Sequence, residues 1–230
     1  MKTILLLTTM LISSFACGQD SINVIEKNDT RIFTINPSLE VRNTAGINVG
    51  ISDDYEKQTI NGLNLQANPI SLIYFLFPKA LPVPTEQQST ATINGLHLST
   101  GGMMEGEKLN GVGISAFHNA RITNGLTLNL FNNTSGILNG LHISGFYNEA
   151  EIGNGLLVAI GNDVQKFNGI QIGAINSNGF GTGLQIGIFN KTKRQRGLQV
   201  GLVNKTEAKK GFQIGFWNKN AKRTLPLINF

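Results

Sequence analysis

Histidine is the side chain in this sequence best suited to proton transfer or metal binding near neutral pH, and the chain has three. They are His97, His118 and His142, and each stands apart from other typical metal ligands. The sequence contains no H-E-x-x-H, no C-x-x-C and no Gly-x-Ser-x-Gly nucleophile motif. These residues therefore predict no catalytic group, no metal site and no cofactor.

Carboxylates are the second group that could do chemistry, because polysaccharide-cleaving β-helix enzymes use carboxylate side chains on the face of a coil. The acidic residues fall into three short clusters, and none is paired in register with another. A polysaccharide-active enzyme is therefore the weakest of our functional hypotheses. The clusters are Asp53, Asp54 and Glu56, then Glu105 and Glu107, then Glu149 and Glu151.

The elements that would position any such residue come from one repeated unit, Gly-φ-x-φ-x-φ-φ-Asn, where φ is apolar. Glycine is in excess, at 27 of 230 residues, or about 12% against about 7% in an average protein. We expect the first glycine to adopt a positive φ at a bend, and the asparagine before it to tolerate the same conformation. Units open every 14 or 15 residues at Gly111, Gly125, Gly140, Gly155, Gly169, Gly183, Gly197 and Gly211, with weaker copies at Gly46, Gly62 and Gly95.

Within a unit the apolar residues alternate with a period of two, which predicts a strand. In the copy at 183, Leu184, Ile186 and Ile188 share one face, and Gln185 and Gly187 share the other. The small residue at Gly187 and its equivalents either allows close packing, which we favour, or forms a flat binding face. The chain is therefore predicted to be all-β.

Two architectures fit a strand repeat of this length: a β-solenoid of ~14-residue coils with short caps, and an antiparallel β-meander or small β-barrel. We favour the solenoid, because equivalent amides in a parallel stack form ladders and no 28-residue period is present. Two features oppose it: a lysine column of like charge, and polar spacers that leave little to pack on a second face. The amide columns are Gln171, Gln185, Gln199 and Gln213, and Asn162, Asn176, Asn190, Asn204 and Asn218.

The repeated G-[LIF]-Q-[IV]-G-φ-φ-N unit resembles the bacterial surface-repeat lipoproteins and exported proteins built from tandem GVQIGLVN-type units. The resemblance covers roughly Gly95 to Asn218, and more loosely Gly46 to Leu65. It implies a location in the envelope or on the surface, and no catalytic activity. The unit is clean only in its last four copies.

The amino terminus predicts export, because residues 1–18 combine one lysine, an apolar run and small residues, as in a signal peptide. Cys17 is either the lipidated first residue of the mature chain or part of a cleavage site before Gln19. We then expect an N-terminal cap at 19–45 and a repeat domain at 46–223. An insertion at 66–92, with an apolar run at 70–77 of unassigned role, interrupts the repeat domain, and a C-terminal cap at 224–230 follows it.

The charge is unevenly distributed. The formal net charge is +5, yet the segment between Lys191 and Arg223 has ten basic residues and one acidic residue, Glu207. In a solenoid these residues form one basic edge, which is either a contact for an anionic surface or a solvated edge that blocks pairing with other sheets. The candidates for this contact are Lys191, Lys193, Arg194, Arg196, Lys205, Lys209, Lys210, Lys219, Lys222 and Arg223.

These observations together predict a non-catalytic exported repeat protein that acts as a scaffold or as a binding or adhesive surface. Its expected location is the outer membrane, the periplasm or the cell surface. The expected partner is the outer membrane or an anionic envelope glycolipid, and nucleic acid is not expected because the chain is predicted to be exported. The alternative is an outer-membrane β-barrel or another membrane-associated protein.

Overall fold

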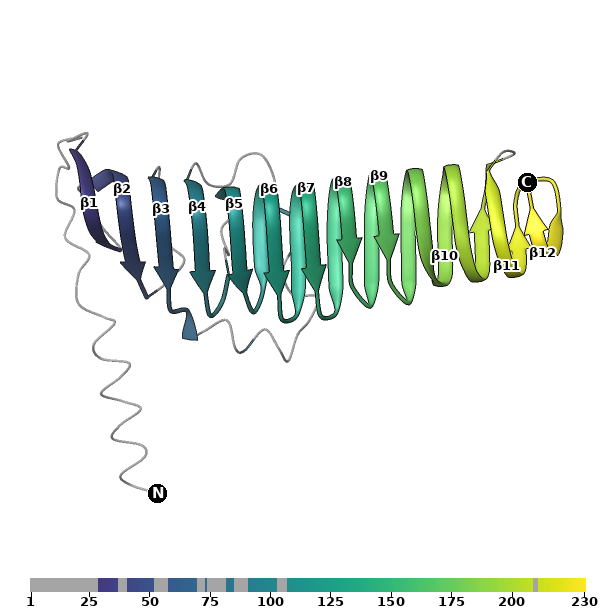
Figure 1. The fold of residues 1–230 in the computed structure, drawn as a ribbon, viewed down its shortest axis with the longest axis horizontal. Helices are drawn as coiled ribbons and strands as arrows, with labels where there is room; N and C mark the ends of the chain where they lie inside the picture. Colours follow the sequence, from purple (N-terminus) through teal and green to yellow (C-terminus); the bar gives the residue numbers. More distant parts are fainter. Residues whose placement is uncertain are drawn as a thin grey trace, which may run out of the picture.

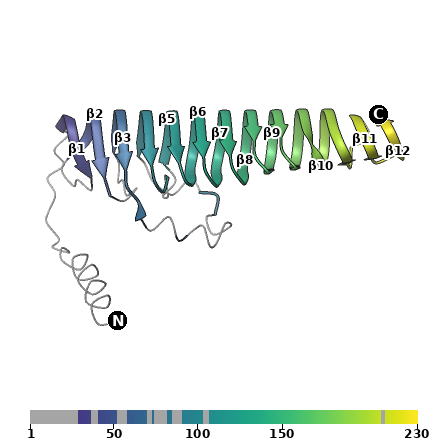
Figure 2. The same ribbon diagram turned by 60° about the horizontal axis from the view of Figure 1, so that its bottom comes forward.

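The computed structural model describes residues 29–36, 41–51, 58–69, 73, 82–84, 91–102, 107–208 and 211–230. The strands form a single sheet of twelve, whose order in space is their order in the sequence. Figure 1 shows them following one another along one long axis, and Figure 2 shows the same row from below. The predicted signal segment with Cys17, most of the apolar run 70–77, and Lys209 and Lys210 lie outside the described residues.

The strands β6 to β9 have 12 or 13 residues each and span most of a coil, and β10 is longer because it runs through successive coils without a break. The strands are β1 Asp29–Asn36, β2 Val41–Gly50, β3 Thr59–Gln66, β4 Thr92–Ser99, β5 Glu107–Ser115, β6 His118–Asn129, β7 Asn132–Ser144, β8 Tyr147–Val158, β9 Gly161–Ile172, β10 Ile175–Thr206, β11 Phe212–Lys219 and β12 Thr224–Asn229.

Neighbouring strands from β1 to β11 pair in parallel, with equivalent repeat positions side by side. Gly183 is paired with Gly169 and Leu198 with Phe212. The register continues across the insertion, since Gly62 of β3 is paired with Gly95 of β4. The β-solenoid prediction is confirmed, and the antiparallel alternative is wrong for these strands. Only β12, among the described strands, pairs in the antiparallel direction, against β11 at the last coil.

The first glycine of each unit lies at a corner of the coil and has a positive φ. At Gly183 the φ is +114°, and a Cβ there would lie only 3.0 Å from the carbonyl carbon of Gly169 in the previous coil. The expectation for the preceding asparagines is wrong: Leu227 is the one described non-glycine residue with positive φ. The asparagines instead form an outer ladder, in which Asn124 Nδ2 donates to Asn110 Oδ1 at 2.7 Å.

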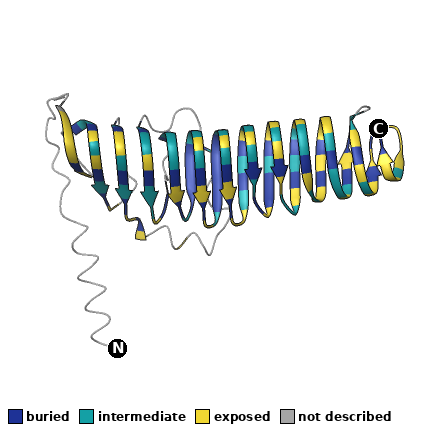
Figure 3. Ribbon diagram, viewed as in Figure 1, coloured by how far each residue is buried: buried dark blue, intermediate teal, exposed yellow. Residues whose placement is uncertain are grey.

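The interior of the coils mixes polar and apolar side chains as far as Phe167 and is polar beyond it, and the apolar face of the repeat points outward. Two small apolar clusters are buried, and beyond Phe167 no described hydrophobic residue is buried. In Figure 3 buried and exposed bands alternate along every coil. The clusters comprise Ile60, Ala91, Ile93, Leu109 and Ala120, and then Leu138, Ala150, Leu157, Val164 and Phe167.

Candidate binding surface

The amide columns predicted from the sequence form continuous hydrogen-bonded ladders inside the solenoid. Gln199 Nε2 donates to Gln185 Oε1 at 2.7 Å, and Gln213 Nε2 donates to Gln199 Oε1 at 2.8 Å. All three side chains are at most 1% exposed. Because a buried amide without partners is costly, such ladders are the condition for a polar interior.

The asparagine ladder uses its hydrogen bonds fully and runs in the opposite direction. Asn190 Nδ2 donates to Asn204 Oδ1 of the next coil at 2.8 Å, and also to the Val200 carbonyl at 2.9 Å. The glutamine ladder donates toward the previous coil and the asparagine ladder toward the next, so the two rows of amide dipoles oppose each other. Gly187 gives this ladder room, since a Cβ there would lie 2.7 Å from the Asn176 amide nitrogen. Close packing at this glycine is therefore confirmed.

Polar spacer residues complete the interior and explain a feature that seemed to oppose the solenoid. The Thr192 hydroxyl donates to Gln185 Oε1 at 2.9 Å from the opposite side of the coil. A second face of apolar residues is therefore not needed where the first face carries amides. The lysine column, the other opposing feature, is accommodated because the side chains of Lys191, Lys205 and Lys219 are exposed to water.

The three histidines lie inside the same polar interior and are fully buried. His97 Nδ1 is hydrogen-bonded to the Asn64 amide at 2.8 Å, and His142 Nδ1 to the Thr127 hydroxyl at 2.9 Å. Burial lowers the pKa of both imidazoles to about 4. It also lowers that of His118 well below its ordinary value, and His97 and His142 add to this effect. The three imidazoles are thus neutral and enclosed, with His97 and His142 bonded between coils and His118 bonded to the Thr123 hydroxyl at 2.9 Å.

Among the described carboxylates, Glu149 of β8 is paired in register with Asp163 of β9, which lies outside the three predicted clusters, whereas the described members of those clusters are not paired with one another. Glu107 is fully buried inside the coil, whereas Glu151 is exposed. Asp53, Asp54, Glu56 and Glu105 lie outside the described residues. In the part of the chain that the structure describes, no group of three histidine, cysteine or acidic side chains is arranged to hold a metal ion.

The outer surface carries two straight columns of aliphatic side chains, which we call the outer wall. They are the residues one and three positions after each corner glycine, and none of them is buried. Strand pairing keeps each column in register, as between Leu126 and Leu141 and between Ile170 and Leu184. The columns contain Ile47, Leu63, Leu96, Val112, Leu126, Leu141, Leu156, Ile170, Leu184, Leu198 and Phe212, and Val49, Leu65, Leu98, Ile114, Leu128, Ile143, Val158, Ile172, Ile186, Val200 and Ile214.

A second apolar feature, which we call the apolar edge, lies at the next corner of the last three coils. Its side chains are large, and all except the half-buried Val203 are exposed, reaching 75% at Phe216, 60% at Leu202 and 52% at Trp217. Contiguous apolar surface of this kind typically marks a site of interaction with a protein or a membrane. The apolar edge consists of Ile188, Phe189, Leu202, Val203, Phe216 and Trp217.

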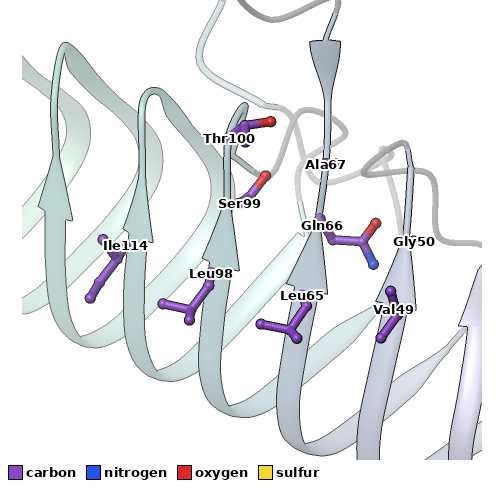
Figure 4. A pocket seen from close by; sticks show the side chains of 9 residues that line it. All are labelled: Val49, Gly50, Leu65, Gln66, Ala67, Leu98, Ser99, Thr100 and Ile114. Atoms are coloured by element: carbon purple, nitrogen blue, oxygen red, sulfur yellow. The ribbon is translucent and has the colours of Figure 1, made fainter.

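The outer wall includes two shallow hollows. One of about 650 Å³ lies along the glycine column between the wall and the apolar edge, lined by residues such as Ile186, Gly187 and Leu202. The other, of about 450 Å³, lies near the amino-terminal end. Figure 4 shows Val49, Leu65, Leu98 and Ile114 side by side along successive coils beside it. Both hollows are lined mainly by carbon and lack converging charged groups.

The predicted basic residues are exposed wherever the structure describes them. Lys205 is paired with Lys219 across β10 and β11, so these lysines form a column. Two of the arginines have local roles: Arg194 lies 5.2 Å from the centre of the Phe180 ring. Arg223 donates to the Phe230 carbonyl at 2.8 Å and covers that ring. The lysine column, rather than these arginines, is therefore the freest part of the basic surface.

Sequence reasoning divided the repeat correctly into two faces, but it counted the polar spacers against the solenoid as if the interior had to be apolar, and that expectation is wrong. The sequence signal for a buried amide face was the recurrence of Gln and Asn at fixed positions, because a face exposed to water would not need the same amide in every coil.

No protein-family model, curated protein or solved structure matches this chain. No helix in the described part of the chain is long and apolar enough to cross a membrane.

Proposed function

We propose that the protein is a non-catalytic, exported repeat protein of the cell envelope whose outer surface is a binding surface. The observation that carries this proposal is the outer wall, an uninterrupted apolar surface on a solenoid whose amides and imidazoles are enclosed. A protein built for reaction chemistry places a few polar groups together in a cleft. Here the same apolar pattern repeats along the whole axis instead.

Export is supported by the apolar amino-terminal segment with its lone cysteine. The test is the mass of the mature amino terminus after expression in a bacterial host, with and without Cys17→Ala. The proposal expects either a lipid-modified Cys17 that is lost in the variant, or a chain that starts at Gln19. A chain that keeps Met1 and stays in the cytoplasm would contradict it.

The absence of catalysis is tested separately with envelope polysaccharides as substrates. The proposal expects no turnover above the background by the purified chain. If turnover is seen and Glu149→Ala with Glu151→Ala abolishes it while folding is retained, the non-catalytic function is wrong.

A further inference from the structure

We propose that the apolar edge and the adjoining outer wall bind the surface of an anionic phospholipid bilayer, with the solenoid lying along it. This inference rests on the proposed function, because it names the partner of the same binding surface. The proposal places Phe216, Trp217 and Leu202 among the upper acyl chains and the lysine column at the level of the headgroups.

The first step is the coincidence of apolar and basic side chains on the same three coils. Phe189 is followed two positions later by Lys191, Val203 by Lys205, and Trp217 by Lys219. Asn190, Asn204 and Asn218 lie between them and point inward, so each apolar residue and its lysine both face outward. This produces a row of large apolar side chains beside a row of ammonium groups.

The second step is that this pairing fits the interfacial layer of a bilayer. Aromatic side chains favour the boundary between headgroups and acyl chains, and lysine extends its charge from there toward phosphate. The charge is of one sign, since Glu207 is the single acidic residue between Lys191 and Arg223. An anionic surface attracts such a segment.

The third step distinguishes the bilayer from a second copy of the chain. Two copies aligned in the same direction would bring their lysine columns together, and like charges in contact oppose association. The coils also follow one another along one long axis (Figure 1), which suits a plane extending beyond the molecule. A head-to-tail pair of copies avoids this repulsion, so a dimer of that kind in lipid-free solution would contradict the bilayer as partner.

Trp217 makes the test specific, because it is the only tryptophan in the chain and lies in the apolar edge. The full chain, as recovered from the exporting cells, is mixed with vesicles of phosphatidylglycerol and phosphatidylcholine, or of phosphatidylcholine alone. We expect a blue shift of Trp217 emission and quenching by brominated acyl chains with the anionic vesicles only. Attachment through the amino-terminal segment alone would leave Trp217 emission unchanged, and that result would overturn the proposal.

Variants separate the contribution of the lysine column from that of the apolar edge. Combined Lys191→Gln, Lys205→Gln and Lys219→Gln should weaken anionic vesicle binding, measured by Trp217 quenching, by roughly a hundredfold. Combined Leu202→Asn and Phe216→Asn should weaken it by at least about tenfold. The matched controls are Lys166→Gln and Phe180→Asn, which alter exposed residues away from the apolar edge and should change binding less than twofold.

Equal vesicle binding by all variants would overturn the proposal. So would a lipid-free dimer in which Trp217 is shielded from acrylamide and which Phe216→Asn dissociates, because a second copy would then be the occupant. Neither result bears on export, which the mass of the mature amino terminus reports independently. The two proposals can therefore fail separately.

Discussion

At the scale of single residues, the corner glycines determine whether a coil can turn. Gly183 has a φ of +114°, and its α-carbon lies against the backbone of Gly169. Gly211 has a similar φ of +139°, but the nearest atom to a Cβ there is the Gln195 carbonyl oxygen at 3.4 Å. Backbone strain is therefore common to both positions, whereas backbone crowding is particular to Gly183.

This difference predicts unequal effects of the same substitution. We expect Gly183→Ala to lower the free energy of unfolding by about 3 kcal/mol or more, because strain and a backbone clash add. We expect Gly211→Ala to cost about 1 kcal/mol, from strain alone. Urea unfolding followed by far-ultraviolet circular dichroism measures both. Equal losses would show that crowding between coils does not constrain the corner.

The buried histidines predict a second residue-scale effect, on the pH dependence of stability. The folded-state pKa of His97 is lowered to about 4 by burial, against about 6.5 in an unfolded chain. The unfolded state therefore binds more protons below pH 6.5, and the stability present above that pH is lost as the pH falls toward 4. At pH 5 the loss from His97 is about 2 kcal/mol.

The variant His97→Asn isolates this contribution. Asparagine should be tolerated there, because Asn48 and Asn64 occupy the equivalent position in the two preceding coils and are hydrogen-bonded to each other. Between pH 7 and pH 5 the variant should lose about 2 kcal/mol less unfolding free energy than the parent chain. Comparing the two chains at pH 8, where imidazole is neutral in both states, removes any packing difference. Parallel stability curves from pH 8 to pH 5 would mean that His97 is not held neutral by burial.

At the scale of the element, the coil is held by register more than by any one contact. Its side-chain ladders form only if equivalent positions of successive coils lie side by side. The last coils meet this condition because each is 14 residues long. The 15-residue coils keep register at the corners, as Gly125 and Gly140 are paired. The register between β6 and β7 does not shift from Ala120 to Ile122, whereas that between β5 and β6 does, because Glu107 pairs with Ala120 and Lys108 with Ile122.

Deleting whole or partial coils tests this dependence on register. Removing residues 183–196 joins Thr182 to Gly197 and preserves every column, so the shortened chain should fold, with a lower urea midpoint. Removing only residues 183–189, which are half of one coil, brings the amide columns of the coils before and after the deletion out of register. The chain should then lose most of its strand signal in circular dichroism. If both deletions fold equally well, register is not what holds the coils.

At the scale of the whole molecule, the solenoid encloses its amide and imidazole ladders together with two small apolar clusters, and it exposes the apolar outer wall. Parallel stacking could be predicted because Gln185 and Gln199 recur at an interval that only a parallel stack brings into contact. The enclosure of the histidines and Glu107 could not, because alternation assigns residues to faces without saying which face is inside. That choice depends on whether amides on both sides of a coil can satisfy each other, as Thr192 and Gln185 do.

The outer wall is a consequence of the amide face lying inside the coil. Where the amides occupy the interior, the apolar side chains that alternate with them along the strand point outward, and together they form a surface that no single repeat would reveal. This exposed surface supports the proposed binding role and the proposed bilayer contact.

The orientation of the two faces is tested most directly by cysteine labelling of the native chain in lipid-free buffer. Cysteines are introduced singly as Gln185→Cys, Gln199→Cys, Ile186→Cys and Leu202→Cys, and peptide mass spectrometry distinguishes each from Cys17. The structure predicts rapid maleimide labelling at 186 and 202, and labelling at 185 and 199 only after denaturation. Rapid labelling at 185 and 199 with protection at 186 and 202 would contradict the polar interior.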